Sequence, residues 1–261
     1  MNKVFVIISI FNNQKDIILC LESFIKVYPK INIIVIDNAS TDNSLKSILS
    51  LKYERLQIIR NEKNLGFAKA ANKGIKLALK QNAEAVLLLN PDTLPSRGFL
   101  EPLLTNPAEI VGPILKFKRN NQWIYDFGGK INFWLGRTSH NEYPKYMVKN
   151  IKAPDYLSGC CLLIKRKVFE KIGFLDERYF LFFEDADFCL KAKKAGFKVS
   201  LEPKSMMIHK LSEGKAKSRF YMYHLLRSNF IFINNCIPLY RRQIAYSYLL
   251  LLTFKMLLNR L

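Results

Sequence analysis

The feature that most constrains the fold is an alternation, over the first ninety residues, of short β-branched runs with segments of helical periodicity. The apolar runs cover Val4–Ile10, Ile31–Ile36, Leu56–Arg60 and Ala85–Leu89. Between them, apolar residues recur at helical spacing over Ile17–Val27, Ser44–Leu51 and Phe67–Leu79. Strands that are apolar on both faces and separated by helices are typical of a parallel sheet covered by helices on both sides. We therefore predict an α/β fold with a Rossmann-like, mixed but mostly parallel sheet flanked by helices.

The second half of the chain is patterned less evenly. Residues 101–154 show no clear periodicity, and they carry aromatic residues among basic residues and glycines, namely Trp123, Tyr125, Phe127, Trp134, Tyr143 and Tyr146. Beyond them the pattern predicts a strand over Tyr156–Ile164 and helices over Lys167–Ile172 and Ala186–Ala195. Gly196 is well placed to end the last of these helices.

Two apolar segments near the C-terminus, Phe230–Leu239 and Ile244–Leu258, are separated by Pro238 and a pair of arginines. Each is shorter than the ~20 apolar residues that a membrane-spanning helix needs. One interpretation is a pair of amphipathic helices in the membrane interface, with basic side chains near lipid phosphates, namely Arg241, Arg242, Lys255 and Arg260. The alternative is a helical pair packed on the domain or on a second subunit.

The charge balance is strongly basic, with 41 Lys and Arg against 21 Asp and Glu and a formal net charge of +20. Such a surface attracts polyanions, so nucleic acid, acidic phospholipid and phosphorylated substrates are all candidate partners. The hydrophobic fraction of 49% is that of a globular protein. Five cysteines without a C-x-x-C pair, and the lack of a signal peptide, favour a reducing cytoplasm.

Carboxylates follow two of the predicted strands, at the edge where a parallel sheet binds its ligands. Asp37 ends the second run, and Asp92 follows the fourth in the sequence Asn90-Pro91-Asp92. A carboxylate such as Asp37 can accept a hydrogen bond from the imide N–H of a pyrimidine base. One such as Asp92 suits Mg²⁺ or Mn²⁺, which take oxygen ligands. Each motif has a simpler alternative, because Asp37 can cap the next helix and Asn90-Pro91-Asp92 can form a turn.

Three further acids follow an aromatic stretch in Phe182-Phe183-Glu184-Asp185-Ala186-Asp187. Burial and like-charged neighbours raise the pKa of a carboxyl group, which suits a general base that takes a proton from a hydroxyl group. The alternative is an acidic N-terminus for the following helix, which the helix dipole favours.

A histidine and a basic run close the list of candidate groups. His209 follows an apolar stretch and is a candidate metal or phosphate ligand, although a lone histidine is more often structural. Downstream stand Lys215, Lys217, Arg219 and Arg227. These would neutralise a departing diphosphate, or they form an ordinary solvated basic face.

Taken together, these segments resemble the inverting GT-A-fold glycosyltransferases of family 2, and especially their rhamnosyltransferase-like branch. The resemblance is carried, in the family's order, by Ile34–Ser44 (IVIDNASTDNS), Asn61–Gly74, Leu87–Thr93, Ser158–Lys167, Gly173–Ala195 and His209. It implies a metal-dependent enzyme, a hexosyltransferase, that moves a sugar from a nucleoside-diphosphate donor to a glycan or lipid-linked saccharide acceptor. Rhamnose from a dTDP-linked donor is favoured, with UDP-linked hexoses as the alternative, in the synthesis of cell-surface polysaccharide.

The resemblance also implies roles position by position. The nucleotide-sugar pocket would be lined by Ser9, Phe11, Asp37, Asn38, Asn64, Gly66, Asn72, Asn90 and Asp92. The divalent metal, Mg²⁺ or Mn²⁺, would be held by Asp92 and His209. Asp185 would be the general base, with Glu184 beside it. Near the acceptor we expect Trp134, whose ring can stack on a sugar, together with Gly159 and Asp187.

The chain departs from the family pattern at the metal motif, where many relatives carry Asp-x-Asp and this sequence has Asn90 first. Asn-Pro-Asp is common in the rhamnosyltransferase-like branch, so the departure points to that branch. We expect a GT-A catalytic domain over 1–219, with a nucleotide-binding half at 1–100 and an acceptor and catalytic half at 101–219. Amphipathic helices over 220–261 would then contact an anionic membrane or pair in a homodimer, in the cytoplasm or at its membrane face.

Three other readings compete with this one. A nucleotidyltransferase would show a Gly- and basic-rich loop after the first strand, where this chain has Phe11-Asn12-Asn13-Gln14. A nucleic-acid-binding module would present aromatic residues in a basic groove, whereas the aromatic residues of the whole chain lie largely inside apolar runs, so we expect no nucleic-acid partner. A catalytically silent relative would have lost acids that this chain retains, namely Asp37, Asp92 and Asp185.

Overall fold

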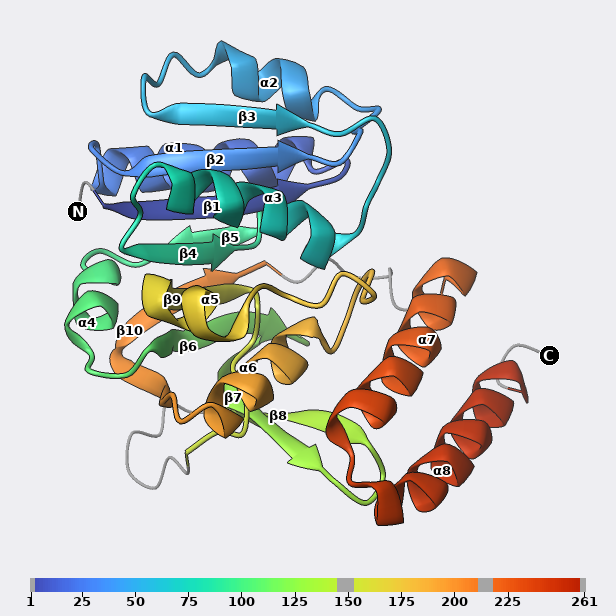
Figure 1. Ribbon diagram of the computed structural model, residues 1–261. Helices are drawn as coiled ribbons and strands as arrows, with labels where there is room; N and C mark the ends of the chain where they lie inside the picture. The colour runs from blue at the N-terminus through green and yellow to red at the C-terminus, as the bar shows by residue number, and fades with distance from the viewer. Residues whose placement is uncertain (1–2, 145–152, 211–217, 259–261) are drawn as a thin grey trace.

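The computed structural model describes residues 3–144, 153–210 and 218–258 (Figure 1). Its strands are β1 (Val4–Ile10), β2 (Asn32–Asp37), β3 (Leu56–Arg60), β4 (Ala85–Leu89), β5 (Thr93–Pro95), β6 (Ile110–Arg119), β7 (Gln122–Asn132), β8 (Arg137–Tyr143), β9 (Cys161–Lys165) and β10 (Val199–His209). Its helices are α1 (Gln14–Val27), α2 (Ser44–Ser50), α3 (Phe67–Lys80), α4 (Leu100–Thr105), α5 (Arg166–Ile172), α6 (Glu184–Lys194), α7 (Arg219–Cys236) and α8 (Leu239–Leu258).

All of these strands belong to one mixed sheet, in the order β3-β2-β1-β4-β9-β6-β10-β5, with β7 attached to β6 and β8 to β7. The strands β1 to β4 pair in parallel, as the alternation of strands and helices predicts. β9 runs antiparallel between β4 and β6, and β10 is parallel to β6 but antiparallel to β5. The predicted mixed, mostly parallel sheet with flanking helices is therefore confirmed.

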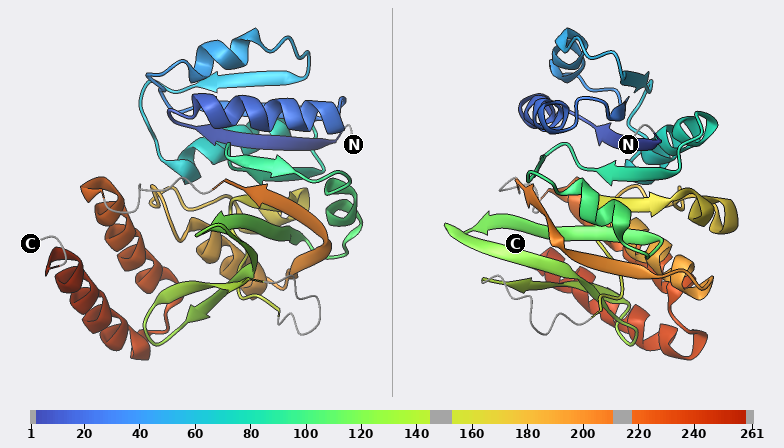
Figure 2. Two further views of the ribbon diagram at one scale, coloured as in Figure 1. Left: turned by 180° about the vertical axis from the view of Figure 1, so that it is seen from behind. Right: turned by 90° about the vertical axis from the view of Figure 1, so that its left-hand side faces the viewer.

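The sheet has a hydrophobic core on each face, because successive side chains of a buried strand point to opposite sides. In β1, Phe5 and Ile7 pack into one core and Val6 and Ile8 into the other. Helices α3, α5 and α6 cover the first face, and α1 and α4 cover the second (Figure 2). Gly74 lets α3 approach the sheet closely, since an added Cβ would lie 2.7 Å from side-chain carbons of Ile7 and Ile36.

The structure corrects the prediction for residues 101–154, which are regular rather than irregular over most of their length. β6 and β7 form a long antiparallel pair, and β8 continues it as the outermost strand. Most side chains of β8 are polar and partly or fully exposed, so the apolar alternation that signals a strand is absent there. The strand expected from Tyr156 begins only at Cys161, because Tyr156 instead bridges to Gly129 of β7.

The two C-terminal helices pack against each other and stand beside the sheet (Figure 1). α7 is capped by Ser218, whose hydroxyl oxygen accepts a hydrogen bond from the backbone N–H of Tyr221 at 3.1 Å. Pro238 separates the helices, as predicted. Of the described helices, none is both long enough and apolar enough to cross a bilayer. The division into a domain at 1–219 and a helical extension at 220–261 stays a prediction.

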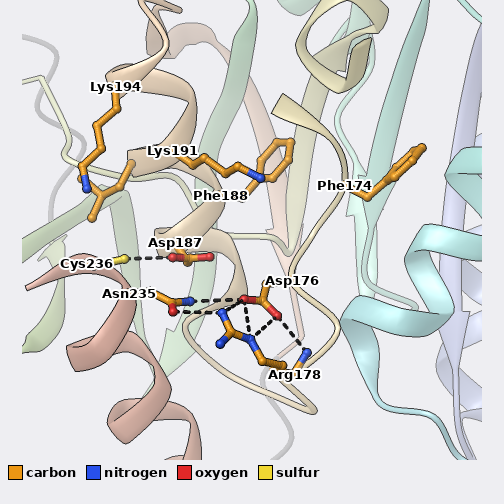
Figure 3. A pocket seen from close by; sticks show the side chains of 10 residues that line it. Phe174, Asp176, Arg178, Asp187, Phe188, Lys191, Lys194, Asn235 and Cys236 are labelled. Carbon is orange, nitrogen blue, oxygen red and sulfur yellow. Dashed lines mark hydrogen bonds and ion pairs between the residues drawn. The ribbon is translucent and has the colours of Figure 1, made fainter. Parts of the chain in front are cut away.

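Polar contacts anchor α7 to the rest of the molecule at a pocket of about 370 Å³ between α6 and α7 (Figure 3). The amide of Asn235 donates to Asp176 at 3.2 Å and accepts from the guanidinium of Arg178 at 2.9 Å. The thiol of Cys236 donates to the Asp187 carboxylate, with 2.9 Å between Sγ and Oδ1.

All five cysteines of the chain are buried and free of disulfide bonds.

Candidate active site

Two adjoining pockets lie at the edge of the sheet where the parallel strands end. The first, which we call the strand-end pocket, has a volume of about 540 Å³, and the second, the acid pocket, about 340 Å³. Four residues line both of them, namely Phe67, Asn90, Leu181 and Phe182. Asp92 lines the strand-end pocket and Asp185 lines the acid pocket. Acids that are far apart in the sequence therefore meet at one continuous depression.

Most residues expected to bind the nucleotide sugar line the strand-end pocket, namely Ser9, Phe11, Asn38, Asn64, Gly66, Asn90 and Asp92. Asn38 holds several of them in place, since its Nδ2 donates to Ser9 Oγ at 3.1 Å and to the Gly66 carbonyl at 3.3 Å. Gly66 has φ +80°, and an added Cβ would lie 2.5 Å from the carbonyl oxygen of Phe180. A glycine is therefore required here for the Phe180 backbone to approach the pocket.

Asp37 and Asn72 lie behind the pocket rather than in its lining. Asp37 is fully buried, and its Oδ1 accepts a hydrogen bond from the backbone N–H of Ser40 at 3.0 Å. Its Oδ2 has no hydrogen-bond partner and lies 3.9 Å from the guanidinium Nε of Arg60. Asn72 bonds both backbone groups of Leu175 and so ties α3 to the loop before α6. Both residues support the pocket, and their predicted contact with the nucleotide sugar stays a prediction.

Asp92 and His209 are brought together by strand pairing. β5 and β10 are antiparallel, and their register sets His209 directly opposite Thr93, the neighbour of Asp92. His209 Nε2 lies 3.3 Å from Asp92 Oδ1, and this buried oxygen accepts no hydrogen bond. Within the described ranges, no group of three or more His, Cys, Asp or Glu side chains could hold a metal ion. Two other candidates for the diphosphate, Lys215 and Lys217, lie outside the described residues.

Glu184 and Asp185 enter the acid pocket from the first turn of α6. The helix follows two residues in the left-handed region, Phe182 with φ +70° and Phe183 with φ +68°. Such strain in non-glycine residues persists only where packing enforces it. The ring of Phe183 packs on Phe232 of α7 with 5.1 Å between centroids, and that of Phe182 packs on Tyr221 at 4.7 Å. Helix α7 thus helps to orient the acid pair.

The two acids differ in their hydrogen bonds. Asp185 accepts backbone N–H groups from Gly159 at 2.9 Å and from Ala186 at 2.8 Å. Glu184 Oε2 is buried without a partner. Burial raises the pKa of Asp185, while burial and the neighbouring charge of Asp185 raise the pKa of Glu184 to about 8. A carboxylate with a raised pKa that lines a pocket is suited to accept a proton from a substrate.

Two residues expected near the acceptor, Trp134 and Asp187, line neither the acid pocket nor the strand-end pocket. Asp187 faces the pocket between α6 and α7 in Figure 3, because residues two apart on a helix point in different directions. Trp134 lies at the tip of the β7–β8 hairpin, half exposed, with the Arg241 guanidinium 4.4 Å from its ring centroid. Gly159, in contrast, lines the acid pocket and donates to Asp185. An acceptor contact for Trp134 or Asp187 stays a prediction without support from these positions.

Several residues of the pockets were not predicted. An aromatic wall of the strand-end pocket is made by Phe180, Phe182, Phe220 and Tyr221. In the acid pocket, β8 contributes Arg137 and His140, which lie opposite α6. A signal for the second group exists in the sequence, where the glycine pair Gly128-Gly129 marks a break in a strand before a histidine.

A mixed sheet with a pocket at the carboxyl ends of its parallel strands, and a buried acid pair beside that pocket, is the arrangement expected of a GT-A glycosyltransferase. The model of the family "Glycosyl transferase family 2" matches residues 5–173, and the chain belongs to this family. The predictions of the family, of the fold and of a glycosyltransferase activity are thereby confirmed. The nucleotidyltransferase and binding-module readings gain no support.

The chain is similar to several proteins that are named as glycosyltransferases. The chain is 24% identical over 231 residues to an N-acetylglucosaminyl-diphospho-decaprenol L-rhamnosyltransferase of Mycobacterium tuberculosis, covering 78% of this chain and 74% of that protein. It is 26% identical over 221 residues to a dTDP-rhamnosyl transferase of Shigella flexneri, covering 79% and 72%. Among solved structures, a mannosyltransferase of Pyrobaculum calidifontis in complex with GDP-Man and Mn²⁺ matches with a TM-score of 0.65 at 19% identity, covering 95% of this chain and 69% of that one.

Proposed function

We propose that this enzyme is an inverting glycosyltransferase that moves a sugar from a nucleoside-diphosphate donor to a glycan or a lipid-linked saccharide in cell-surface polysaccharide synthesis. The observation that carries the proposal is the adjacency of the two pockets, with Asp92 in one and Asp185 in the other. Rhamnose from a dTDP-linked donor is the favoured sugar, because relatives in Mycobacterium and Shigella are rhamnosyltransferases. UDP-linked hexoses are the alternative donors.

The strand-end pocket is the proposed donor site. Ser9, Asn38, Asn64 and Gly66 offer hydroxyl, amide and backbone groups to the nucleotide. The chemistry of Asp92 and His209 fits a divalent ion, because a carboxylate oxygen is a ligand for both Mg²⁺ and Mn²⁺, and the imidazole nitrogen favours Mn²⁺ of the two. The buried Asp92 Oδ1 without a hydrogen-bond partner supports this assignment. When bound, the ion would neutralise negative charge on the leaving diphosphate.

The acid pocket is the proposed site of the chemistry. The acceptor hydroxyl lies against Asp185, which takes its proton as the oxygen attacks the anomeric carbon of the donor sugar. The bond from that carbon to the diphosphate oxygen breaks in the same displacement, so the configuration inverts and no covalent intermediate with the enzyme forms. The backbone N–H groups of Gly159 and Ala186 hold the Asp185 carboxylate in place for this transfer.

The proposal includes contact of the α7–α8 pair with an anionic membrane, where a lipid-linked acceptor would be found. Between 219 and 258 the chain has no acidic residue, but it has five basic ones, namely Arg219, Arg227, Arg241, Arg242 and Lys255. Large apolar side chains on α8 are exposed, among them Leu250 at 72% and Phe254 at 61%. An apolar helix face with flanking cations is typical of helices that lie in a membrane interface. A homodimer through the same helices is the competing use of this surface.

A donor hydrolysis assay tests the proposed chemistry, since transfer to water requires no knowledge of the acceptor. Purified protein with Mn²⁺ is compared with Asp185→Asn on dTDP-rhamnose, UDP-glucose and GDP-mannose. We expect the variant to lose about 100-fold or more in turnover, the contribution of a positioned general base. Asp16→Asn on α1 is the matched control, and it should retain full turnover. Equal turnover of Asp185→Asn and the unmodified protein would remove Asp185 as the base.

A further inference from the structure

The β7–β8 hairpin carries a histidine–carboxylate pair into the acid pocket. His140 lines this pocket, and its Nδ1 lies 2.7 Å from Asp126 Oδ2. Asp126 is buried on β7, and its other oxygen accepts the backbone N–H of Gly128 at 2.9 Å. With Nδ1 engaged by Asp126, Nε2 is the ring nitrogen left for the pocket. The side chain of His140 is 35% exposed, in keeping with a position at a pocket wall.

A bulge in the hairpin creates this arrangement. The pairing of β7 with β8 shifts register between Asp126, opposite Glu142, and Gly129, opposite His140. Gly128 has φ +85°, and an added Cβ at Gly129 would lie 2.0 Å from the Tyr156 ring. The absence of a side chain at Gly129 lets Tyr156 pack on the strand, where its ring meets the His140 ring edge to face at 5.6 Å. Bulges of this kind re-aim a side chain next to a functional site.

Charges on several elements face the histidine. Asp126 lies on β7, Glu142 on β8 and Asp185 on α6, and the ring of Tyr156 packs against the histidine. Burial lowers the pKa of His140, but the Asp126 carboxylate, with help from Asp185 and Glu142, raises it above its ordinary value overall. In return, the charge on His140 lowers the pKa of Asp185, against the larger effect of burial. The other charged residues that line the acid pocket are Arg137, Glu184 and His209.

We propose that His140, oriented by Asp126, is a positioning residue for the transfer reaction, whose positive charge stabilises the ionised Asp185 carboxylate in the acid pocket. This inference rests on the proposed role of Asp185 as the base. A base must be ionised before it can accept the proton of the acceptor hydroxyl, and burial alone works against that state. The hairpin thus supplies a cation where α6 supplies the carboxylate.

The pH dependence of turnover tests this proposal. Donor hydrolysis is measured between pH 5 and 9 at saturating donor for the unmodified protein, His140→Gln, Asp126→Asn and the double variant. We expect the acidic limb of the His140→Gln profile to move upward by about one pH unit, because a nearby opposite charge shifts a carboxyl pKa by that order. On the alkaline plateau, where Asp185 is ionised in either case, the rate should change by less than about twofold. Thermal melting confirms that each variant is folded.

The double variant separates positioning from a general structural effect. If Asp126 acts through His140, the double variant should have the same acidic limb as His140→Gln, rather than the sum of two shifts. A His140→Gln profile that keeps the original limb, or that falls equally at all pH values, would overturn the inference. That outcome is distinct from failure of the proposed function, in which Asp185→Asn itself keeps full turnover.

Discussion

At the scale of single residues, adjacent carboxyl groups acquire different properties from their partners. Asp185 receives two backbone N–H groups and faces His140, whereas Glu184 is buried with one oxygen unpartnered. Hydrogen bonds to a carboxylate favour its charged form, and burial disfavours it. Glu184 is therefore the member of the pair that holds its proton up to higher pH, which leaves the charge on Asp185.

This difference predicts a pH-dependent stability for Glu184→Gln. The pKa of Glu184 is raised to about 8 in the folded protein, against 4.5 in the unfolded chain. Below pH 4.5 the group is protonated in both states and does not change the free energy of unfolding. Above pH 4.5 the unfolded chain loses this proton first, so the free energy of unfolding falls as the pH rises. We expect the stability of Glu184→Gln relative to the unmodified protein to increase by at least about 1 kcal/mol between pH 5 and pH 8. Urea unfolding at both pH values measures this. A stability difference that is the same at pH 5 and pH 8 would contradict it.

At the scale of elements, the strands that could be predicted from the sequence are the buried, apolar ones, and the strand that could not is polar. β1, β2 and β4 were predictable because both of their faces are buried, so their sequences are almost entirely apolar, as in Val4–Ile10. β8 carries Ser139, His140 and Asn141 in sequence and has no such run. β8 is a strand because it pairs with β7, and the sequence of β8 alone carries no signal of that pairing.

The same division holds for the site. Asp92 follows a recognisable strand and Asp185 begins a recognisable helix, and the two line adjoining pockets, whereas Asp37 lies behind the strand-end pocket. The His140–Asp126 pair depends on a bulge in the register between two strands, which is a property of the folded hairpin. Asp187 shows the converse limit, because a helix turns a residue two positions from Asp185 toward another pocket.

The packing of α7 against α6 predicts a strong dependence on one ring. Phe232 is fully buried on α7 and contacts Phe183 in the turn that aims the acid pair. We expect Phe232→Ala to lower the free energy of unfolding by about 3–5 kcal/mol, as for other buried rings. Phe230, two positions earlier and 53% exposed, is the matched control, and Phe230→Ala should cost less than about 1 kcal/mol. Chemical unfolding of both variants measures these changes. Equal decreases in the free energy of unfolding for Phe232→Ala and Phe230→Ala would contradict a role of α7 in the core.

At the scale of the whole molecule, the basic charge and the exposed face of α8 predict binding to anionic vesicles. The formal net charge of +20 provides attraction that salt screens. Burial of a leucine side chain in the membrane contributes about 1.5–3 kcal/mol. We therefore expect the double variant Leu250→Ser, Leu251→Ser to bind phosphatidylglycerol vesicles at least tenfold more weakly, at about 1.4 kcal/mol per tenfold.

Cosedimentation at low and high salt measures this, with vesicles of phosphatidylcholine, which has no net charge, as the control. A protein that ignores phosphatidylglycerol vesicles, but elutes as a dimer that the same double variant converts to a monomer, would assign the α8 face to a second copy instead. Retained vesicle binding by the double variant would also count against membrane contact through this face.

The short ladder between β5 and β10 has a consequence for how this enzyme can diverge. The ladder joins the two ends of the segment 96–206. Asp92 directly precedes β5, and His209 is the last residue of β10. Insertions or deletions in the loops of that segment need not alter the spacing of Asp92 and His209, whereas a slip of one residue in the ladder would turn His209 to the opposite face of the sheet. The segment between the two strands can therefore vary in length and sequence while Asp92 and His209, the proposed metal ligands, keep their relative position.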